Sequence, residues 1–225
     1  MWFIKDLLRK MLLSFPGSAR RFSKAGKQYG TLGFGKLGYA FTLFFLLLSL
    51  VWALPMQQVS YGEQQIAQEY ELKAVYLYNF LQFVQWPESK RLLTKDGVMV
   101  IGIVGDSPFG EAFEVLQATI RKSGMKPVRV IHYGHYREGL YMRDCHILFV
   151  SAAEKKNFAK IVDDLKDAPV LTVADTHNFL SSGGMISLVQ SDGKLRWMIN
   201  RAQADKAGLR FSAQLLALAV KVVED

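Results

Sequence analysis

The stretch "GVMVIGIVGDSPFGEAFEVLQATIRKSGMKPVRVIHYG" (residues 97–134) decides the fold. Its first part, residues 97–105, is an apolar, β-branched run long enough for one buried strand, and residues 126–134 predict a second strand. Between them, residues 111–122 carry apolar side chains at the spacing of an amphipathic helix. Strand, helix and strand in this order predict a parallel β-α-β unit, the repeating unit of an α/β sheet.

The same alternation continues on both sides of this unit. Downstream, apolar runs at residues 145–151 and 168–175 predict strands, and the amphipathic segment 153–167 between them predicts a helix. Upstream, residues 67–85 carry apolar and aromatic side chains on most sides of a predicted helix. This helix ends at Trp86-Pro87, because proline disfavours helical geometry in the residue before it. We expect the aromatic helix to belong to the core.

The C-terminal part departs from the parallel pattern. Residues 184–200 are two alternating runs joined at Ser191-Asp192-Gly193, which predicts an antiparallel hairpin. A short turn-helix follows, and residues 211–223 predict a closing helix with Ser212 as its N-cap. The predicted fold class is therefore α/β: a mostly parallel sheet flanked by helices on both faces, with a C-terminal antiparallel hairpin and a closing helix.

The formal charge of +8 is concentrated outside the predicted domain. Of the 28 lysines and arginines, eight lie in residues 1–53 beside a single acid, Asp6, whereas residues 54–225 are close to neutral. A nucleic-acid footprint requires a basic patch on the folded body. The distribution of charge therefore argues against nucleic acid as a partner.

The basic segment leads into an uncharged apolar run, residues 37–54, which contains the small residue Ala53 near its end. The run is either a signal peptide cleaved near Ala53 or an uncleaved anchor in the inner membrane. Because positive charge stays on the cytoplasmic side, both alternatives place the rest of the chain in the periplasm. Residues 54–66 predict a polar linker, and residues 67–225 predict the α/β domain.

Gly105-Asp106-Ser107 follows a predicted strand, as the nucleophile does in hydrolases of the Gly-Asp-Ser type. A serine needs a histidine base and a carboxylate to orient it, and Asp175 and His177 are the available partners. However, Pro108 after Ser107 is typical of a helix N-cap with proline at the first helical position. We expect Ser107 to cap the following helix, and a serine esterase that uses Ser107, His177 and Asp175 is the alternative function.

The remaining candidates for chemistry are histidines and one cysteine. His132 and His135 have no third ligand at a suitable spacing, which indicates loop histidines instead of a metal site. Cys145 is the only cysteine, so no internal disulfide can form. Cys145 and His146 open a strand and point to opposite faces, which favours a buried structural thiol. We therefore predict no catalytic residue, no metal site and no cofactor.

Three segments resemble the signature of the YfiR-like family: "YELKAVYLYNFLQFVQWPE" (70–88), "IGIVGDSPFGEAFEVL" (101–116) and residues 185–219. The similarity covers residues 70–222, nearly the whole exported part. We expect the signature residues to have structural roles. They are Lys73, Tyr78, Asn79, Phe80, Trp86, Pro87, Pro108, Phe109, Gly110, Asn200, Gly208, Ser212, Leu215 and Leu216.

The resemblance implies a small periplasmic α/β protein that is not an enzyme. The best-understood members bind the periplasmic sensor region of an inner-membrane diguanylate cyclase and hold it inactive, which ties cyclic-di-GMP and biofilm formation to envelope or redox conditions. Because Cys145 stands alone, redox switching through an internal disulfide is excluded here. The identity of the partner, the docking surface, homodimerisation and the releasing signal stay open.

Overall fold

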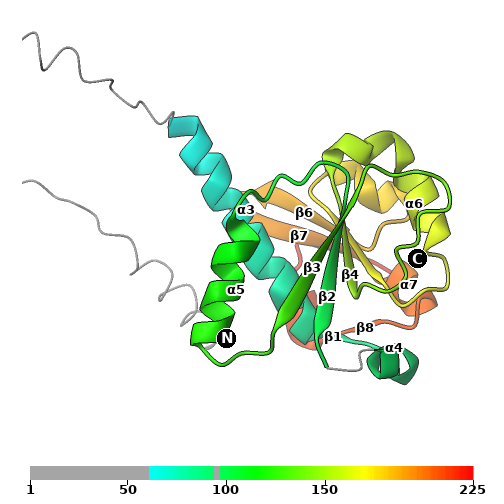
Figure 1. Ribbon diagram of the computed structural model, residues 1–225. Helices are drawn as coiled ribbons and strands as arrows, with labels where there is room; N and C mark the ends of the chain where they lie inside the picture. Colours follow the sequence, from blue (N-terminus) through cyan, green and yellow to red (C-terminus); the bar gives the residue numbers. More distant parts are fainter. Residues whose placement is uncertain (1–60, 94–96, 225) are drawn as a thin grey trace, which may run out of the picture. The chain divides into compact units, whose positions relative to one another are not determined.

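The computed structural model describes residues 61–93 and 97–224, which form an α/β domain (Figure 1). Its main sheet has seven strands in the order β3-β2-β4-β5-β6-β7-β9. The predicted leader, its apolar run and residues 54–60 lie outside the described residues. The strands are β2 (Met99–Val104), β3 (Val128–Gly134), β4 (Ile147–Val150), β5 (Leu171–Ala174), β6 (Ile186–Ser191), β7 (Lys194–Asn200) and β9 (Lys221–Val223).

The pairing of the strands confirms the predicted fold class. The first five strands, from β2 to β6, are parallel to one another, and β2, the first in the chain, lies between β3 and β4. β7 returns antiparallel to β6 through the predicted hairpin, with Ser191 opposite Lys194. Asp192 and Gly193 both have positive φ in this turn, as a two-residue hairpin loop of this kind requires.

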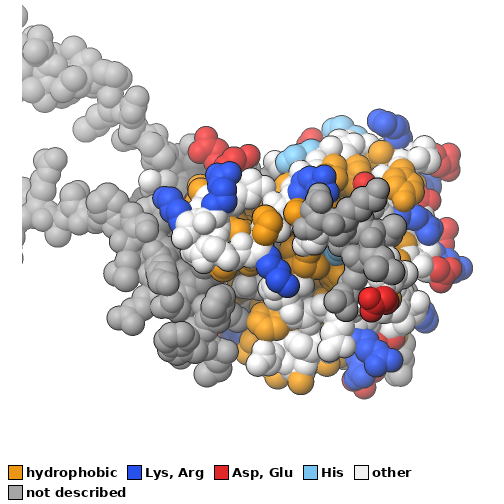
Figure 2. Space-filling model, turned by 60° about the horizontal axis from the view of Figure 1, so that its bottom comes forward, with side chains coloured by type: hydrophobic (Ala, Val, Ile, Leu, Met, Phe, Trp, Pro, Cys, Tyr) orange, Lys and Arg blue, Asp and Glu red, His pale blue; other side chains and the backbone are white. Residues whose placement is uncertain are grey.

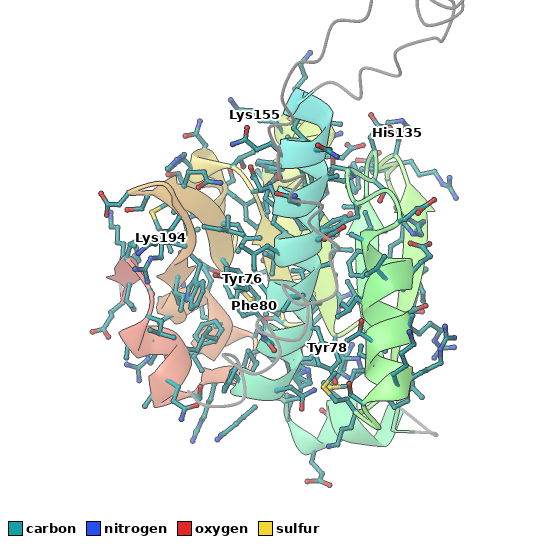
Figure 3. All side chains as sticks on the ribbon, turned by 90° about the vertical axis from the view of Figure 1, so that its left-hand side faces the viewer. Tyr76, Tyr78, Phe80, His135, Lys155 and Lys194 are labelled. Carbon is teal, nitrogen blue, oxygen red and sulfur yellow. The ribbon has the colours of Figure 1, made fainter. Side chains whose placement is uncertain are left out.

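Helices cover both faces of the sheet (Figure 1). On one face lie α3 (Tyr61–Phe83) and α5 (Ala112–Lys122), and on the other lie α6 (Phe158–Asp164) and α7 (Arg201–Lys206). Figure 3 looks onto the first face and shows α3 running between α5 and the C-terminal hairpin. No helix within residues 61–93 and 97–224 has both the length and the apolar character that crossing a bilayer requires.

Aromatic packing fixes α3 on the sheet, as the sequence predicts for a core helix. The rings of Tyr76 and Phe80 both contact Trp197 of β7 edge-on, with centroids 5.2 and 5.6 Å away (Figure 3). On the other side of the helix, the Tyr78 hydroxyl donates to the Lys126 carbonyl oxygen at 3.1 Å, just before β3. The helix begins at Tyr61, earlier than predicted, and ends at Phe83.

Two predicted helices are shorter than expected. The segment predicted as one helix over 153–167 divides into a 3₁₀ helix, η1 (Ala152–Asn157), and α6. The closing helix, α8 (Ala213–Ala217), is capped by Ser212 as predicted, but it ends early and residues 221–223 form β9. The helix gives way to a strand for two reasons. β-Branched valines favour extended backbone, and the free edge of β7 offers hydrogen-bond partners, as the bond from the Val220 N–H to the Trp197 carbonyl shows.

A two-stranded ribbon and two short helices connect the larger elements. In the ribbon, β1 (Val84–Gln85), directly after α3, pairs antiparallel with β8 (Arg210–Phe211) near the C-terminus. The helix α4 (Glu88–Leu93) follows Trp86-Pro87, and a second 3₁₀ helix, η2 (His177–Ser182), links β5 to β6. The ribbon thus brings the first and last parts of the domain together.

A substitution at Gly184 tests how tightly the core around η2 is packed. A methyl group at Gly184 would overlap the Phe179 ring, which is fully buried and packs edge-on against Phe158. We therefore expect Gly184→Ala to lower the free energy of unfolding by about 1–3 kcal/mol, measured by chemical denaturation. Ser181→Ala, at an exposed position of η2, is the control and leaves it unchanged. Equal stability of both variants would contradict this packing.

Candidate functional site

The carboxyl ends of the parallel strands form the edge at which open α/β sheets usually bind ligands. Each of the sequence candidates at this edge follows a strand. Asp106 and Ser107 follow β2, His135 follows β3, and Asp175 and His177 follow β5. The chain crosses between the two halves of the sheet here, because β3 and β4 lie on opposite sides of β2.

The predicted helix-capping role of Ser107 is wrong. α5 begins at Ala112, and its N-cap is Glu111, whose side chain makes no capping bond. Residues 108–111 form a turn in which the Ala112 N–H donates to the Phe109 carbonyl at 2.9 Å. Ser107 is exposed, and its hydroxyl makes no hydrogen bond to any described residue. Because this turn separates Pro108 from α5, Ser107 lies too far before the helix to cap its first N–H groups.

Asp175 belongs to a buried ion pair with α3. Its Oδ2 atom accepts a hydrogen bond from Lys73 Nζ at 2.8 Å and another from the Tyr70 hydroxyl at 2.8 Å. Lys73 also pairs with Glu69 at 2.8 Å and lies 3.9 Å from the centroid of the Tyr70 ring. The Lys73 and Asp175 side chains are only 5% and 8% exposed, so the pair is shielded from water.

The surroundings of Lys73 keep its ammonium group charged. Burial alone would lower the pKa of Lys73, but the hydrogen bonds to Asp175 and Glu69 outweigh it and raise the pKa above its usual value. Burial also raises the pKa of Tyr70, which therefore donates its proton to Asp175. The carboxylate of Asp175 is thus occupied by two donors from α3.

The arrangement of Asp175 leaves the esterase triad unassembled. His177 is exposed at the start of η2, and among the described residues it makes no hydrogen bond or ion pair with Ser107 or Asp175. A serine needs a histidine within hydrogen-bond reach to take its proton. The geometry of these three residues gives no support to the esterase alternative.

The histidine beside the Gly-Asp-Ser segment is His135, at the end of the domain seen in Figure 3. Its Nε2 atom lies 3.3 Å from Asp106 Oδ1, and its Nδ1 atom lies 3.1 Å from Glu154 Oε1. The two carboxylates therefore contact different nitrogens of the ring. No group of three or more histidine, cysteine or acidic side chains in the described ranges is placed to hold a metal ion.

Glu154 is a buried carboxylate at this edge. It accepts hydrogen bonds from the Asn157 side chain at 2.7 Å and from the Tyr136 N–H at 3.2 Å. Burial alone would raise the pKa of Glu154, but these bonds and the contact with His135 outweigh it and lower the pKa. Glu154 thus ties the loop after β3 to η1.

A second buried polar cluster lies at the amino ends of β2 and β4. The Lys90 side chain is 1% exposed and donates to the Arg143 carbonyl at 2.6 Å. Cys145 is fully buried, as predicted, and burial raises the pKa of its thiol to about 12. His146 stacks on Trp86 with centroids 5.7 Å apart, and its Nδ1 accepts the Val100 N–H at 3.1 Å.

The signature residues lie at junctions between elements. Lys73 reaches β5, Tyr78 the start of β3, and Phe109 packs on Phe149 of β4. Gly110 and Gly208 have positive φ, and Pro87 and Pro108 lie in the turns after α3 and β2. Asn200 caps α7 by accepting the Gln203 N–H, Leu215 is buried, and Leu216 and Asn79 are partly exposed.

Two surface depressions lie away from Ser107, Asp175 and His177. One, of about 520 Å³, is lined by the β1–β8 ribbon and α7, including Arg201 and Arg210. The other, of about 510 Å³, lies between α6 and α7 above Thr172 and Met185. On the face shown in Figure 2, lysine and arginine side chains are interspersed with acidic and apolar ones.

Sequence reasoning missed Lys90 and Glu154, and it listed Lys73 as a signature residue without its buried ion pair. For Lys73 a signal was available, because it shares a helical face with Leu77 and Phe80, at positions i+4 and i+7, and both of these are buried. A lysine on such a face needs an acidic partner. For Lys90 and Glu154 we find no comparable signal in the sequence.

The fold and the site define an α/β protein in which Asp175, Glu154 and His146 are held in internal contacts. A family model described as YfiR/HmsC-like matches residues 70–220, and the chain belongs to this family. The match runs from within α3 to the residue before β9 and confirms the resemblance seen in the sequence. No curated protein matches the chain.

Three solved structures are weakly similar. A conserved domain protein from Vibrio cholerae O1 biovar El Tor is 13% identical with a TM-score of 0.46, covering 68% of this chain and 60% of its own. An ABC domain in complex with L-Trp from Streptococcus pneumoniae is 14% identical with a TM-score of 0.42, and the match covers 60% of this chain and 58% of that one. An inhibitor-bound glycine decarboxylase P-protein is 15% identical with a TM-score of 0.30, covering 84% and 47%. This chain thus spans less than two thirds of each, and such scores support no inference.

The ion pair of Lys73 and Asp175 is tested by a double-mutant cycle. Lys73→Met leaves a buried carboxylate without its cation, and we expect it to lower the free energy of unfolding by about 3–5 kcal/mol. The double variant Lys73→Met/Asp175→Asn recovers part of this loss, because neither charge is left unpaired. The exposed Lys155, visible in Figure 3, provides the control Lys155→Met, which has little effect. Additive effects of the two substitutions would contradict the pairing.

The lowered pKa of His146 leads to a prediction of how the stability of the domain depends on pH. Burial first, and then the charge of Lys90, lower the pKa of His146 from 6.5 to about 4. Between these two values the unfolded chain binds the proton and the folded chain does not, so stability falls as the pH drops from about 6.5 to 4. We expect a loss of about 3 kcal/mol from this group, measured by denaturation at several pH values.

The control for His146 is His132, which is exposed on β3. His146→Asn is less stable than the wild type near neutral pH, but its stability changes less on acidification. His132→Asn keeps the pH dependence of the wild type. A His146→Asn variant with an unchanged pH dependence would show that this imidazole does not contribute to acid sensitivity.

Proposed function

We propose that the chain is an exported, non-enzymatic regulator that represses an inner-membrane diguanylate cyclase, or a similar sensor, by binding the sensor's periplasmic region. The observation that carries the proposal is the family match over residues 70–220. Membership of the YfiR/HmsC-like family suggests a periplasmic regulator of cyclic-di-GMP signalling. The choice of a diguanylate cyclase as the partner, and the repression of that partner, go beyond family membership and are what we propose.

Export is part of the proposal. The apolar run at residues 37–54 follows eight basic residues, which keep the leader on the cytoplasmic side whether the chain is cleaved near Ala53 or stays anchored. The near-neutral charge of residues 54–225 suits a protein partner better than a polyanion. Biofilm formation would follow from the effect on cyclic-di-GMP.

We propose that the regulator acts by binding to the periplasmic region of the sensor and stabilising its inactive state. A bound regulator shifts an active–inactive equilibrium by as much as its affinities for the two states differ. A tenfold change in the active–inactive equilibrium constant needs a difference of about 1.4 kcal/mol, and a useful switch needs a few kcal/mol, which a modest interface can supply. The regulator itself breaks no bond, so no catalytic side chain is required.

The proposal is tested by deleting the chain from its host and measuring cellular cyclic-di-GMP. We expect the level to rise on deletion and to return when the full chain is supplied. A variant without residues 1–53 stays in the cytoplasm and fails to restore repression. An unchanged cyclic-di-GMP level after deletion would contradict the proposal.

Ser107→Ala separates regulation from hydrolysis in the same assay. Ser107 is exposed and makes no hydrogen bond to a described residue, so the substitution leaves the fold intact. We expect this variant to repress as well as the wild type and to show no change in cleavage of short-chain esters. Ester cleavage by the wild type that is lost in Ser107→Ala would instead favour the hydrolase.

A further inference from the structure

His135, labelled in Figure 3, has a carboxylate beside each of its two ring nitrogens. Its Nδ1 atom lies 3.1 Å from Glu154 Oε1, and its Nε2 atom lies 3.3 Å from Asp106 Oδ1. Among the described residues, His135 is the only basic side chain that pairs with either carboxylate. Three elements therefore meet at this ring, since Asp106 follows β2, His135 follows β3 and Glu154 lies on η1.

The two carboxylates differ in how freely they can move. The Glu154 side chain is 4% exposed and accepts hydrogen bonds from the Asn157 side chain and the Tyr136 N–H. It also packs on the backbone of Gly105, where an added methyl group would lie 2.8 Å from Glu154 Cγ. The Asp106 side chain is 75% exposed and makes no other hydrogen bond or ion pair with a described residue. Glu154 is therefore fixed, whereas Asp106 is free to leave the ring.

The neutral imidazole ring cannot donate to both carboxylates. It has one N–H group and one nitrogen lone pair, whereas the charged ring has two N–H groups. Burial would raise the pKa of Glu154, but its hydrogen bonds lower the pKa, so Glu154 is a charged acceptor at neutral pH. We therefore expect the neutral ring to hold its proton on Nδ1, facing Glu154. The lone pair of Nε2 then faces Asp106 and attracts it in no way.

We propose that His135 is a proton-dependent latch between the end of β2 and η1. The neutral ring binds Glu154 alone. When the ring takes up a proton, Nε2 gains an N–H group and pairs with Asp106, so the charged ring joins both carboxylates. Acidification thus closes the latch, and a rise in pH opens it.

The part of the chain that the latch controls is short. At one end, the Gly105 N–H donates to the Gly134 carbonyl at 2.8 Å, and at the other the buried Phe109 packs edge-on against Phe149. Between these two anchors, residues 106–108 are exposed or partly exposed. They lie at the carboxyl edge of the sheet, where open α/β sheets usually bind their ligands. The latch therefore changes the order and the charge of a surface that is suited to recognition.

Other titratable groups near this edge do not form part of the latch. The Tyr136 hydroxyl donates to Asp164 at 2.7 Å, which raises the pKa of Tyr136 to about 12 and keeps it neutral. Arg137, Lys155 and His177 are exposed, and in the described part of the chain they form no ion pair with Asp106 or Glu154. A change in the order of residues 106–108 on acidification is therefore assigned to the ring of His135.

The latch is tested by NMR on the chain in the form that the host exports, between about pH 8 and pH 5, where histidine ordinarily changes its charge. At the higher pH we expect the ring ¹⁵N signals of His135 to show a proton on Nδ1. At the lower pH both ring nitrogens carry protons. Because an exposed ion pair is weak, the readout is local order and not the stability of the domain. We expect the backbone order parameters of Asp106 and Ser107 to rise from below about 0.6 to about 0.85 on acidification.

Asp106→Asn is the matched variant. Its amide donates to the neutral Nε2, and its oxygen accepts from the charged ring, so we expect the order of residues 106–108 to be independent of pH. The control His132→Asn, at an exposed position of β3, keeps the pH dependence of the wild type.

Two results would overturn the proposal. One is a wild type in which the amides of Asp106 and Ser107 have the same order at both pH values. The other is an Asp106→Asn variant that keeps the full pH dependence. Since the measurement involves no partner protein, its failure leaves the proposed repression standing, and a failure of the repression assay leaves the latch standing.

Discussion

The buried contact between Lys73 and Asp175 joins the first helix of the domain to the sheet. Two short hydrogen bonds from α3 reach the end of β5, so a helix that precedes every strand of the main sheet is held at its carboxyl edge. Because a charge buried without its partner is costly, the pair restricts how the helix can lie on the sheet. The packing of Tyr76 and Phe80 on Trp197 holds the same helix against β7. The same contact engages the one carboxylate that an esterase triad would have required.

The parallel sheet could be predicted from the sequence because each strand is a compact apolar run and each turn has its own chemistry. The hairpin at Asp192-Gly193 is the clearest case. The errors lie where local patterns compete with tertiary contacts. Ser107-Pro108 has the pattern of a cap, but an extra turn precedes α5. Residues 221–223 have helical spacing, but the open edge of β7 draws them into a strand. Lys73 was identified as a signature residue, yet its partner lies 102 positions away and no local pattern points to it.

Two polar clusters lie at the two ends of the sheet. His135 contacts both Asp106 and Glu154 at one end, and Lys90, Cys145 and His146 are buried at the other. Groups that satisfy each other in this way connect elements of the fold.

The measurement that tests the central claim most directly is amide hydrogen exchange of α3 in the wild type and in Asp175→Asn. If the ion pair holds α3 to the sheet, amides of residues 70–83 exchange in the wild type only when the whole domain unfolds. In the variant these amides then exchange sooner, while those of β4 and β5 keep their protection. Protection of α3 that is unchanged in Asp175→Asn would contradict the account, because aromatic packing alone would then hold the helix in place.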